Sequence, residues 1–177
     1  MRKDENTILL ASGAALGLFF GARFLLLNTL KDKSLKPYLK SDPVDNLSSA
    51  RTMYKFMRKV GIPRNSAIGM LNNAYHESRF RPDAYHIDSN NKPSGGLFQW
   101  NGNRFFAMQN FVPDWRTNWK GQILYALKEY GKEYLSKHFT HPADASYWFT
   151  VHFERPANTE QSARNRLRTI NTIKRIG

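Results

Sequence analysis

The stretch YHESRFRPDAYHIDSNNKPSGGLFQW, residues 75–100, decides how the rest of the chain is interpreted. It opens with Glu77 at the end of a helical pattern and closes on Gly-Gly-Leu-Phe-Gln-Trp. Between them, residues 81–96 contain two prolines and two glycines and show no helical period, so we expect a loop or a small hairpin there. This order of elements puts Glu77 at a helix end beside a polar loop.

The flanking sequence is typical of a mainly helical domain. We expect one helix from Ser48 or Ser49 to about Val60, a second over residues 65–79, and helical structure again from about Leu97. Apolar residues at helical spacing predict three further helices, and we interpret these stripes as core. The stripes are Trp119, Ile123, Leu127, Tyr130 and Tyr134; Ala145, Trp148, Phe149 and Phe153; and Ala163, Leu167, Ile170 and Ile173.

The N-terminal residues 1–27 predict a transmembrane helix that anchors the chain. No charged residue occurs over 6–22, and the apolar length, with Arg23 included, matches the roughly 20 residues that span a bilayer. We therefore expect residues 7–27 to lie in a lipid membrane as a single pass. Gly13, Gly17 and Gly21 share one helical face, where a partner helix could approach closely. A cleaved signal peptide and a buried helix are the alternatives.

The remainder of the chain divides into a basic linker, residues 28–46, and a globular domain, residues 47–177. The net charge is +13, of which residues 45–177 carry +10, so we expect a polyanionic partner: nucleic acid, anionic lipid or the bacterial wall. The positive residues are scattered, which disfavours nucleic acid. Cysteine is absent and the five histidines lack ligand-like spacing, so neither a metal site nor a cofactor is expected.

Glu77 is the candidate catalytic group. Cleavage of a glycosidic bond needs a carboxylic acid that can give its proton to the departing oxygen. Aromatic residues surround Glu77 in the sequence, among them Tyr75 and Phe80, so a helix end facing an apolar cleft would suit such a donor. His76 lies roughly 100° around the helix from Glu77, so we expect it to pack or to form a hydrogen bond rather than to act as a base.

Several separated motifs carry a family resemblance. They are His76-Glu77-Ser78; residues 94–100 followed by Gly102 and Arg104; Ala143-Asp144-Ala145; and Phe153-Glu154-Arg155-Pro156. The first two resemble the signature of goose-type lysozymes and soluble lytic transglycosylases. Together, over about residues 50–172, they are similar to the lysozyme-like domain of bacteriophage tail-associated and virion-associated lysins. The resemblance implies an α+β lysozyme-like fold, mainly α-helical, with a small hairpin at the cleft.

The resemblance also implies roles for individual residues. Glu77 matches the general acid, and Gln99 lies in the stretch behind it, where it could orient sugar or hold Glu77. Ser94 could steady an N-acetyl group. Trp100 could stack on a sugar ring, and Glu154 could lie in the cleft or pair with an arginine.

A second carboxylate is less well defined by the sequence. Asp88 lies in the loop where lysozymes place their second acid and is our candidate, although an Asp in an Asp-Ser-Asn-Asn run also suits a turn. A lytic transglycosylase would need no second carboxylate, because the sugar's own hydroxyl closes an anhydro ring. The sequence leaves hydrolysis and transglycosylation both open.

These features lead us to expect a membrane-anchored, phage-type enzyme that cleaves the β-1,4 bond between N-acetylmuramic acid and N-acetylglucosamine in peptidoglycan. It would open the wall while a viral genome enters the cell, from a virion membrane or the host inner membrane. An endolysin held by a signal-anchor helix is one alternative. A catalytically inactive virion protein that binds wall glycan is another.

Overall fold

The computed structural model describes residues 49–89 and 91–175. The predicted anchor, its glycine face and the linker lie outside these residues. Within the described part of the chain, no helix has both the length and the apolar character needed to cross a membrane.

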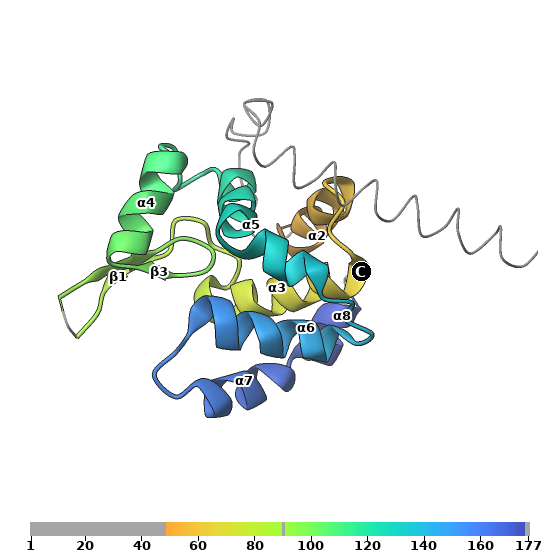
Figure 1. Ribbon diagram of the computed structural model, residues 1–177. Coiled ribbons are helices and arrows are strands. Elements are labelled where there is room, and N and C mark those ends of the chain that lie inside the picture. The colour runs from red at the N-terminus through yellow and green to blue at the C-terminus, as the bar shows by residue number, and fades with distance from the viewer. Residues whose placement is uncertain (1–48, 90, 176–177) are drawn as a thin grey trace, which may run out of the picture.

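Seven α-helices, one π-helical segment and a three-stranded sheet make up the described structure (Figure 1). In chain order they are α2 Ser49–Lys59, α3 Arg64–Ser78, β1 Tyr85–Ile87, β2 Pro93–Gly95, β3 Trp100–Asn101, α4 Asn103–Phe111, α5 Trp119–Ser136, α6 Pro142–Phe149, the π-helix η2 Thr150–Glu154, α7 Thr159–Leu167 and α8 Ile170–Lys174. The mainly helical fold with a small hairpin confirms the expected class.

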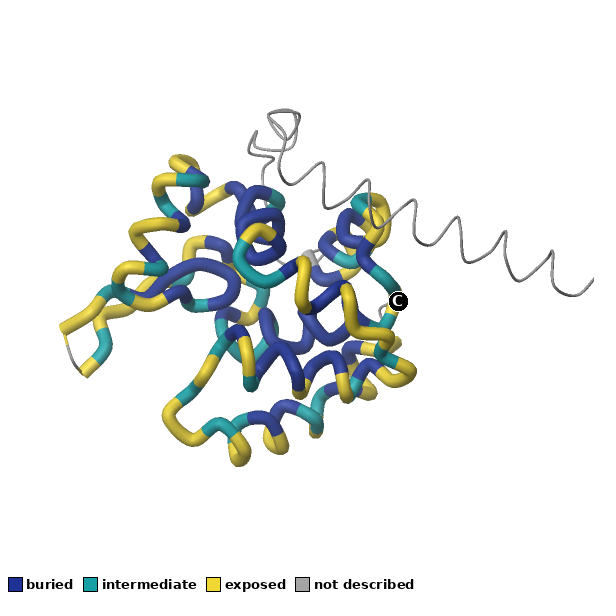
Figure 2. The backbone as a smooth tube through the Cα atoms, in the orientation of Figure 1, coloured by how far each residue is buried: buried dark blue, intermediate teal, exposed yellow. Residues whose placement is uncertain are grey.

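Helix α3 is the centre of the domain. Ten of its fifteen residues are buried, because α2, α6, α7 and α8 pack around it. The tube in Figure 2 shows this burial as a nearly continuous dark segment along α3 and the facing side of α6. Helix α6 runs beside α3 in the same direction, so both helices end on the side of the sheet (Figure 1).

An aromatic cluster fills the space between α6, η2 and the turn that joins β2 to β3. Phe149 and Phe153 stack with ring centroids 4.4 Å apart, and Phe98 contacts both of them. Trp100 packs edge-on against Phe98 and is completely buried. Rings of this size dominate the energetics of a small core, so this cluster fixes where η2 ends.

The sheet is an antiparallel meander in the order β1-β2-β3. Tyr85 pairs with Gly95 and Ser94 pairs with Asn101, so the loop expected over residues 81–96 contains a hairpin. A side chain at Gly95 would meet the ring of Phe105, since a Cβ there would lie 2.5 Å from Cε2. The hairpin therefore packs tightly on α4 and projects from the helical body (Figure 1).

Three expected helix boundaries are wrong. Helical structure does not resume near Leu97 but at Asn103, because residues 96–102 form a turn and strand β3, with Gln99 and Gly102 at positive φ. The stripe ending at Phe153 leaves α-helical geometry at Thr150 and becomes the π-helix. The last predicted helix is two helices, α7 and α8, that break at residues 168–169.

Candidate active site

Glu77 lies in the last turn of α3, where the chain leaves the helix through two residues of positive φ, Arg79 and Phe80. The hydroxyl of the neighbouring Ser78 is within hydrogen-bond distance of two carbonyl oxygens, 3.0 Å from Ala74 and 2.9 Å from Leu97. This joins the helix end to the Gly-Leu-Phe-Gln turn. The resemblance grouped these two motifs, and the structure brings them into contact.

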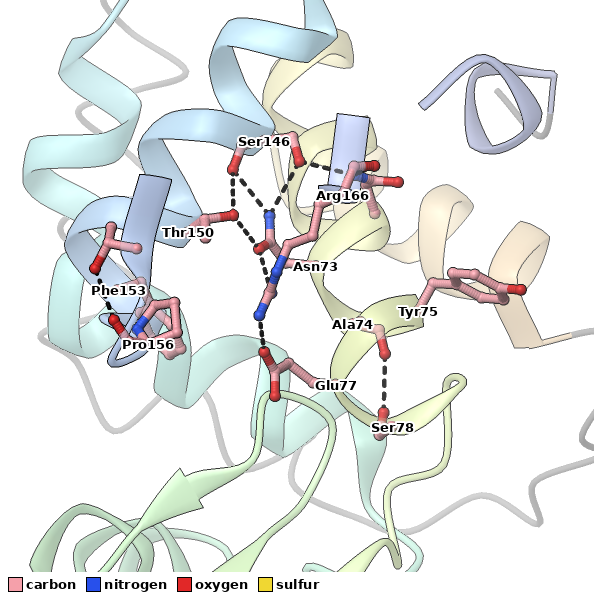
Figure 3. Close-up of polar contacts among 12 residues, drawn as sticks. Asn73, Ala74, Tyr75, Glu77, Ser78, Ser146, Thr150, Phe153, Pro156 and Arg166 are labelled. Atoms are coloured by element: carbon pink, nitrogen blue, oxygen red, sulfur yellow. Dashed lines mark hydrogen bonds and ion pairs between the residues drawn. The ribbon is translucent and has the colours of Figure 1, made fainter. Parts of the chain in front are cut away.

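Arg166 of α7 forms an ion pair with Glu77 (Figure 3). Its NH2 group donates to Glu77 Oε1, and its NH1 group donates to Asn73 Oδ1 at 2.7 Å. The Arg166 side chain is 9% exposed and that of Glu77 is 19% exposed. The glutamate therefore stands at the edge of the protein interior, anchored from within and still open on one side.

A buried polar network around Asn73 supports the Glu77–Arg166 ion pair from the protein interior. Asn73 Nδ2 donates to the carbonyl oxygen of Gly69 at 3.0 Å. It also donates to the carbonyl oxygen of Ser146 at 3.1 Å, and Thr150 Oγ1 donates to Asn73 Oδ1 at 2.8 Å (Figure 3). Thus α3, α6, η2 and α7 all contribute to the position of Arg166. Buried polar groups cost free energy unless their hydrogen bonds are satisfied, and here each of these side chains has partners.

His76 belongs to a second branch of this network. Its Nε2 lies 2.7 Å from Thr169 Oγ1, which lies 2.7 Å from Asn72 Oδ1. Burial lowers the pKa of His76, and the positive charges of Arg166 and Arg79 lower it further. The expectation of a hydrogen-bonding histidine is confirmed.

Glu154, the last residue of η2, lies next to this site. Its side chain is partly exposed overall, but Oε1 is sealed from solvent and has no hydrogen-bond partner among the described residues. Burial raises the pKa of Glu154 well above its usual range, and the negative charge of Glu77 raises it further. The structure thus brings together Glu77 and Glu154, two of the residues expected from the sequence.

Asp88 lies in the turn between β1 and β2. Its Oδ1 accepts from the backbone N–H of Lys92 at 2.8 Å, and its Oδ2 accepts from Asn101 Nδ2 at 2.8 Å. These contacts are those of an aspartate that holds a turn, the alternative reading of the Asp-Ser-Asn-Asn run. A catalytic role for Asp88 stays a prediction.

Three other candidate site residues form hydrogen bonds within the protein. Trp100 is 0% exposed and its Nε1 donates to Glu129 at 2.7 Å, which contradicts the expected stacking on a sugar ring. Ser94 is buried, and its hydroxyl accepts from Asn101 Nδ2 at 2.8 Å. The amide of Gln99 donates to the carbonyls of Gly96 at 2.8 Å and Ala84 at 3.3 Å, while its Oε1 is sealed without a partner among the described residues.

The Gly-Leu-Phe-Gln turn depends on a residue that the motifs did not indicate. Gln122 of α5 accepts from the backbone N–H of Leu97 at 2.6 Å, and a Cβ at Gly96 would lie 2.6 Å from the same oxygen. Gly96 also has a φ of 82°. Only glycine meets both conditions without strain, which explains the second glycine of the Gly-Gly pair.

Sequence reasoning missed Arg166, Asn73 and Thr150. The available signal was the Asn72-Asn73 pair inside the otherwise apolar stretch 67–74 of α3, since buried amides need polar partners from elsewhere in the fold. Within residues 49–89 and 91–175, no group of three or more His, Asp or Glu is arranged to hold a metal ion.

Comparison with known proteins shows a similarity that covers the whole described domain. The family model described as phage tail lysozyme matches residues 48–174, which include every residue of the network above. No curated protein matches the chain.

Proposed function

Because the chain belongs to the phage tail lysozyme family, we propose that it cleaves the β-1,4 bond between N-acetylmuramic acid and N-acetylglucosamine in peptidoglycan, with Glu77 as the general acid. The family indicates a peptidoglycan-lytic enzyme. The observation that supports this assignment of Glu77 is its anchoring. An inward-facing arginine and a buried amide network hold this one glutamate at a partly open helix end.

Fixing the acid contributes directly to rate. A proton donor in a glycosidase must stand within hydrogen-bond reach of the glycosidic oxygen, and misplacement by about 1 Å costs on the order of 10²-fold. The guanidinium of Arg166 fixes one carboxyl oxygen of Glu77. The other oxygen is then the one that faces the sugar chain.

The test of the proposal is lysis of purified cell walls, followed as clearing in a zymogram and as loss of turbidity. The full chain should clear the wall, and Glu77→Gln should reduce the rate at least about 10²-fold. Glu133→Gln provides a matched control, because Glu133 is an exposed glutamate on α5. Binding of wall without any clearing by the wild type would leave a glycan-binding virion protein as the function.

We further propose that residues 7–27 anchor the enzyme in a virion membrane or the host inner membrane, and that it opens the wall while the genome enters the cell. The uncharged run over 6–22 supports the anchor. Full-length protein should float with liposomes, and the L16D/F19D variant should stay in the soluble fraction. If both proteins behave alike, the anchor proposal fails.

The glycine face predicts self-association in the same membrane. Gly13→Leu and Gly17→Leu should weaken a dimer detected by crosslinking in liposomes, since bulky side chains prevent close approach of two helices. An endolysin held by a signal-anchor helix makes a different prediction. It would appear as host lysis when the full chain is expressed in the host and the membrane is depolarised.

A further inference from the structure

Helices α3 and α6 are not only parallel but in register. A contact occurs at each turn: Asn65 Nδ2 donates to Thr140 O at 2.9 Å, a Cβ at Gly69 would lie 2.7 Å from Ala145, and Thr150 donates to Asn73 at 2.8 Å. The contacts advance by four residues at a time on α3, and by five at a time along the segment that leads from Thr140 through α6 to η2. The next step leads from Asn73 to Glu77 on α3 and from Thr150 to Glu154 on η2.

The segment that carries Glu154 is held firmly. Arg104 of α4 donates from NH1 to the carbonyl of Phe153 at 3.0 Å, and its guanidinium lies 4.6 Å from the centroid of the Phe153 ring. Glu129 of α5 fixes the same arginine through its two carboxyl oxygens, at 2.9 and 3.2 Å. Isolated π-helical turns often mark functional sites, and this one ends at the carboxyl group in question.

The charge environment of Glu154 favours its neutral form. Burial has the largest effect on the pKa of Glu154 and raises it, and the charges of neighbouring groups have smaller effects. The charged groups that face it from the surrounding elements are Glu77 of α3, Arg166 of α7, Arg104 of α4 and Glu129 of α5, of which the two arginines oppose the rise. Burial therefore favours the neutral form of Glu154, while Glu77 forms its ion pair with Arg166.

We propose that Glu154 is the second carboxyl group of the reaction and acts as the base toward the attacking water. This inference rests on the proposed role of Glu77 as the acid. A proton held by Glu154 can pass to a neighbouring carboxyl group through one water molecule. Transfer of that proton from Glu154 to Glu77 through a water molecule would leave an acid and a base facing the same substrate.

The bond changes then balance. Glu77 gives its proton to the glycosidic oxygen as the bond from that oxygen to the anomeric carbon breaks. A water oxygen forms the new bond to the anomeric carbon, and Glu154 takes a proton from that water. The products are two shorter glycans, one of which carries a newly formed reducing end. Glu77 ends ionised beside Arg166 and Glu154 ends protonated, which is the resting arrangement of the site.

The inference predicts hydrolysis and a measurable rescue. Muropeptides released by the wild type should carry reducing ends, and Glu154→Gln should lower kcat about 10²- to 10⁴-fold with little change in KM. With Glu154→Gly, sodium azide should restore bond cleavage and produce a glycosyl azide, since azide needs no base. A merely structural role of Glu154 would not produce this compound.

The outcomes separate this inference from the function on which it rests. Anhydro ends on the muropeptides, or full activity of Glu154→Gln, would overturn the role of Glu154 and leave Glu77 as acid intact. Loss of activity in Asp88→Asn with Glu154→Gln unaffected would assign the second carboxyl to Asp88 instead. Full activity of Glu77→Gln would overturn the proposed function itself. Circular dichroism of each variant, with Glu133→Gln as control, establishes that it is folded.

Discussion

Gly69 of α3 packs so closely on Ala145 of α6 that a Cβ at residue 69 would lie 2.7 Å from the Ala145 Cβ and from two backbone atoms of α6. Real Cβ atoms do not approach backbone so closely, so the two helices meet at a distance that only glycine permits. The register between α3 and α6, and with it the position of Glu77 beside Glu154, depends on this contact.

The first prediction concerns that contact. Gly69→Ala should destabilise the domain by about 1–3 kcal/mol, because α6 must shift to make room. An alanine for a glycine inside a helix ordinarily stabilises by about 1 kcal/mol, so the two effects have opposite sign. Urea unfolding measures the difference. An unchanged or raised free energy of unfolding would show that α6 yields without cost.

The second prediction concerns the ion pair. Arg166→Met should cost about 3 kcal/mol of stability, since Glu77 loses its charged partner and Asn73 loses a donor in a mostly buried setting. Adding Glu77→Gln should recover part of this loss, because no uncompensated charge then remains. A double-mutant cycle of unfolding free energies tests the coupling, and additive effects would argue against it.

The third prediction concerns the support of the π-helical segment. Glu129→Gln should destabilise the domain by about 1 kcal/mol, because Trp100 and Arg104 both donate to this carboxylate and Arg104 is partly solvated. Glu133→Gln on the same helix should change stability by less than about 0.5 kcal/mol. Thermal unfolding of the two variants side by side makes the comparison, and equal effects would contradict it.

The fourth prediction concerns pH. Burial raises the pKa of Glu154, so above its ordinary value of 4.5 the folded chain keeps a proton that the unfolded chain has lost. The folded state then binds more protons, and the free energy of unfolding contributed by this group falls as the pH rises. Glu154→Gln has no such proton. Its stability relative to wild type should therefore increase between about pH 5 and pH 8.

Unfolding free energies of both proteins across this range provide the measurement. A constant difference between them would mean that Glu154 titrates alike in the folded and unfolded chain. Because His76 is present in both proteins, its own lowered pKa cancels in the comparison.

The part of the site that the sequence predicted correctly is local. Glu77 at a helix end and a hairpin after it follow from periodicity and from proline and glycine positions. Which aromatic side chains are buried could not be predicted from the sequence. Trp100 has the residue type of a sugar-stacking platform, and only the packing of α5 against it shows that its ring is inside and its N–H serves Glu129.

The residues that contact α3 from distant parts of the chain could not be predicted from the sequence. Arg164, Arg166 and Arg168 occur within one short basic stretch, and nothing in that stretch distinguishes the one that turns inward. The π-helical turn could not be predicted from the sequence either. The apolar residues from Ala145 to Phe153 keep an ordinary helical spacing, although the backbone leaves α-helical geometry at Thr150. Both features depend on contacts with α3, which lies more than 70 positions earlier in the chain.

Glu77 and Arg166 are separated by 89 positions, and Asn73 and Thr150 by 77. A contact between such distant segments requires the long loop between them to close first, which slows folding. Glu77 is therefore without its arginine until α7 docks, and a chain that ends before residue 166 contains the whole glutamate motif and no assembled site. Residues up to Arg166 must therefore be synthesised before this site can assemble.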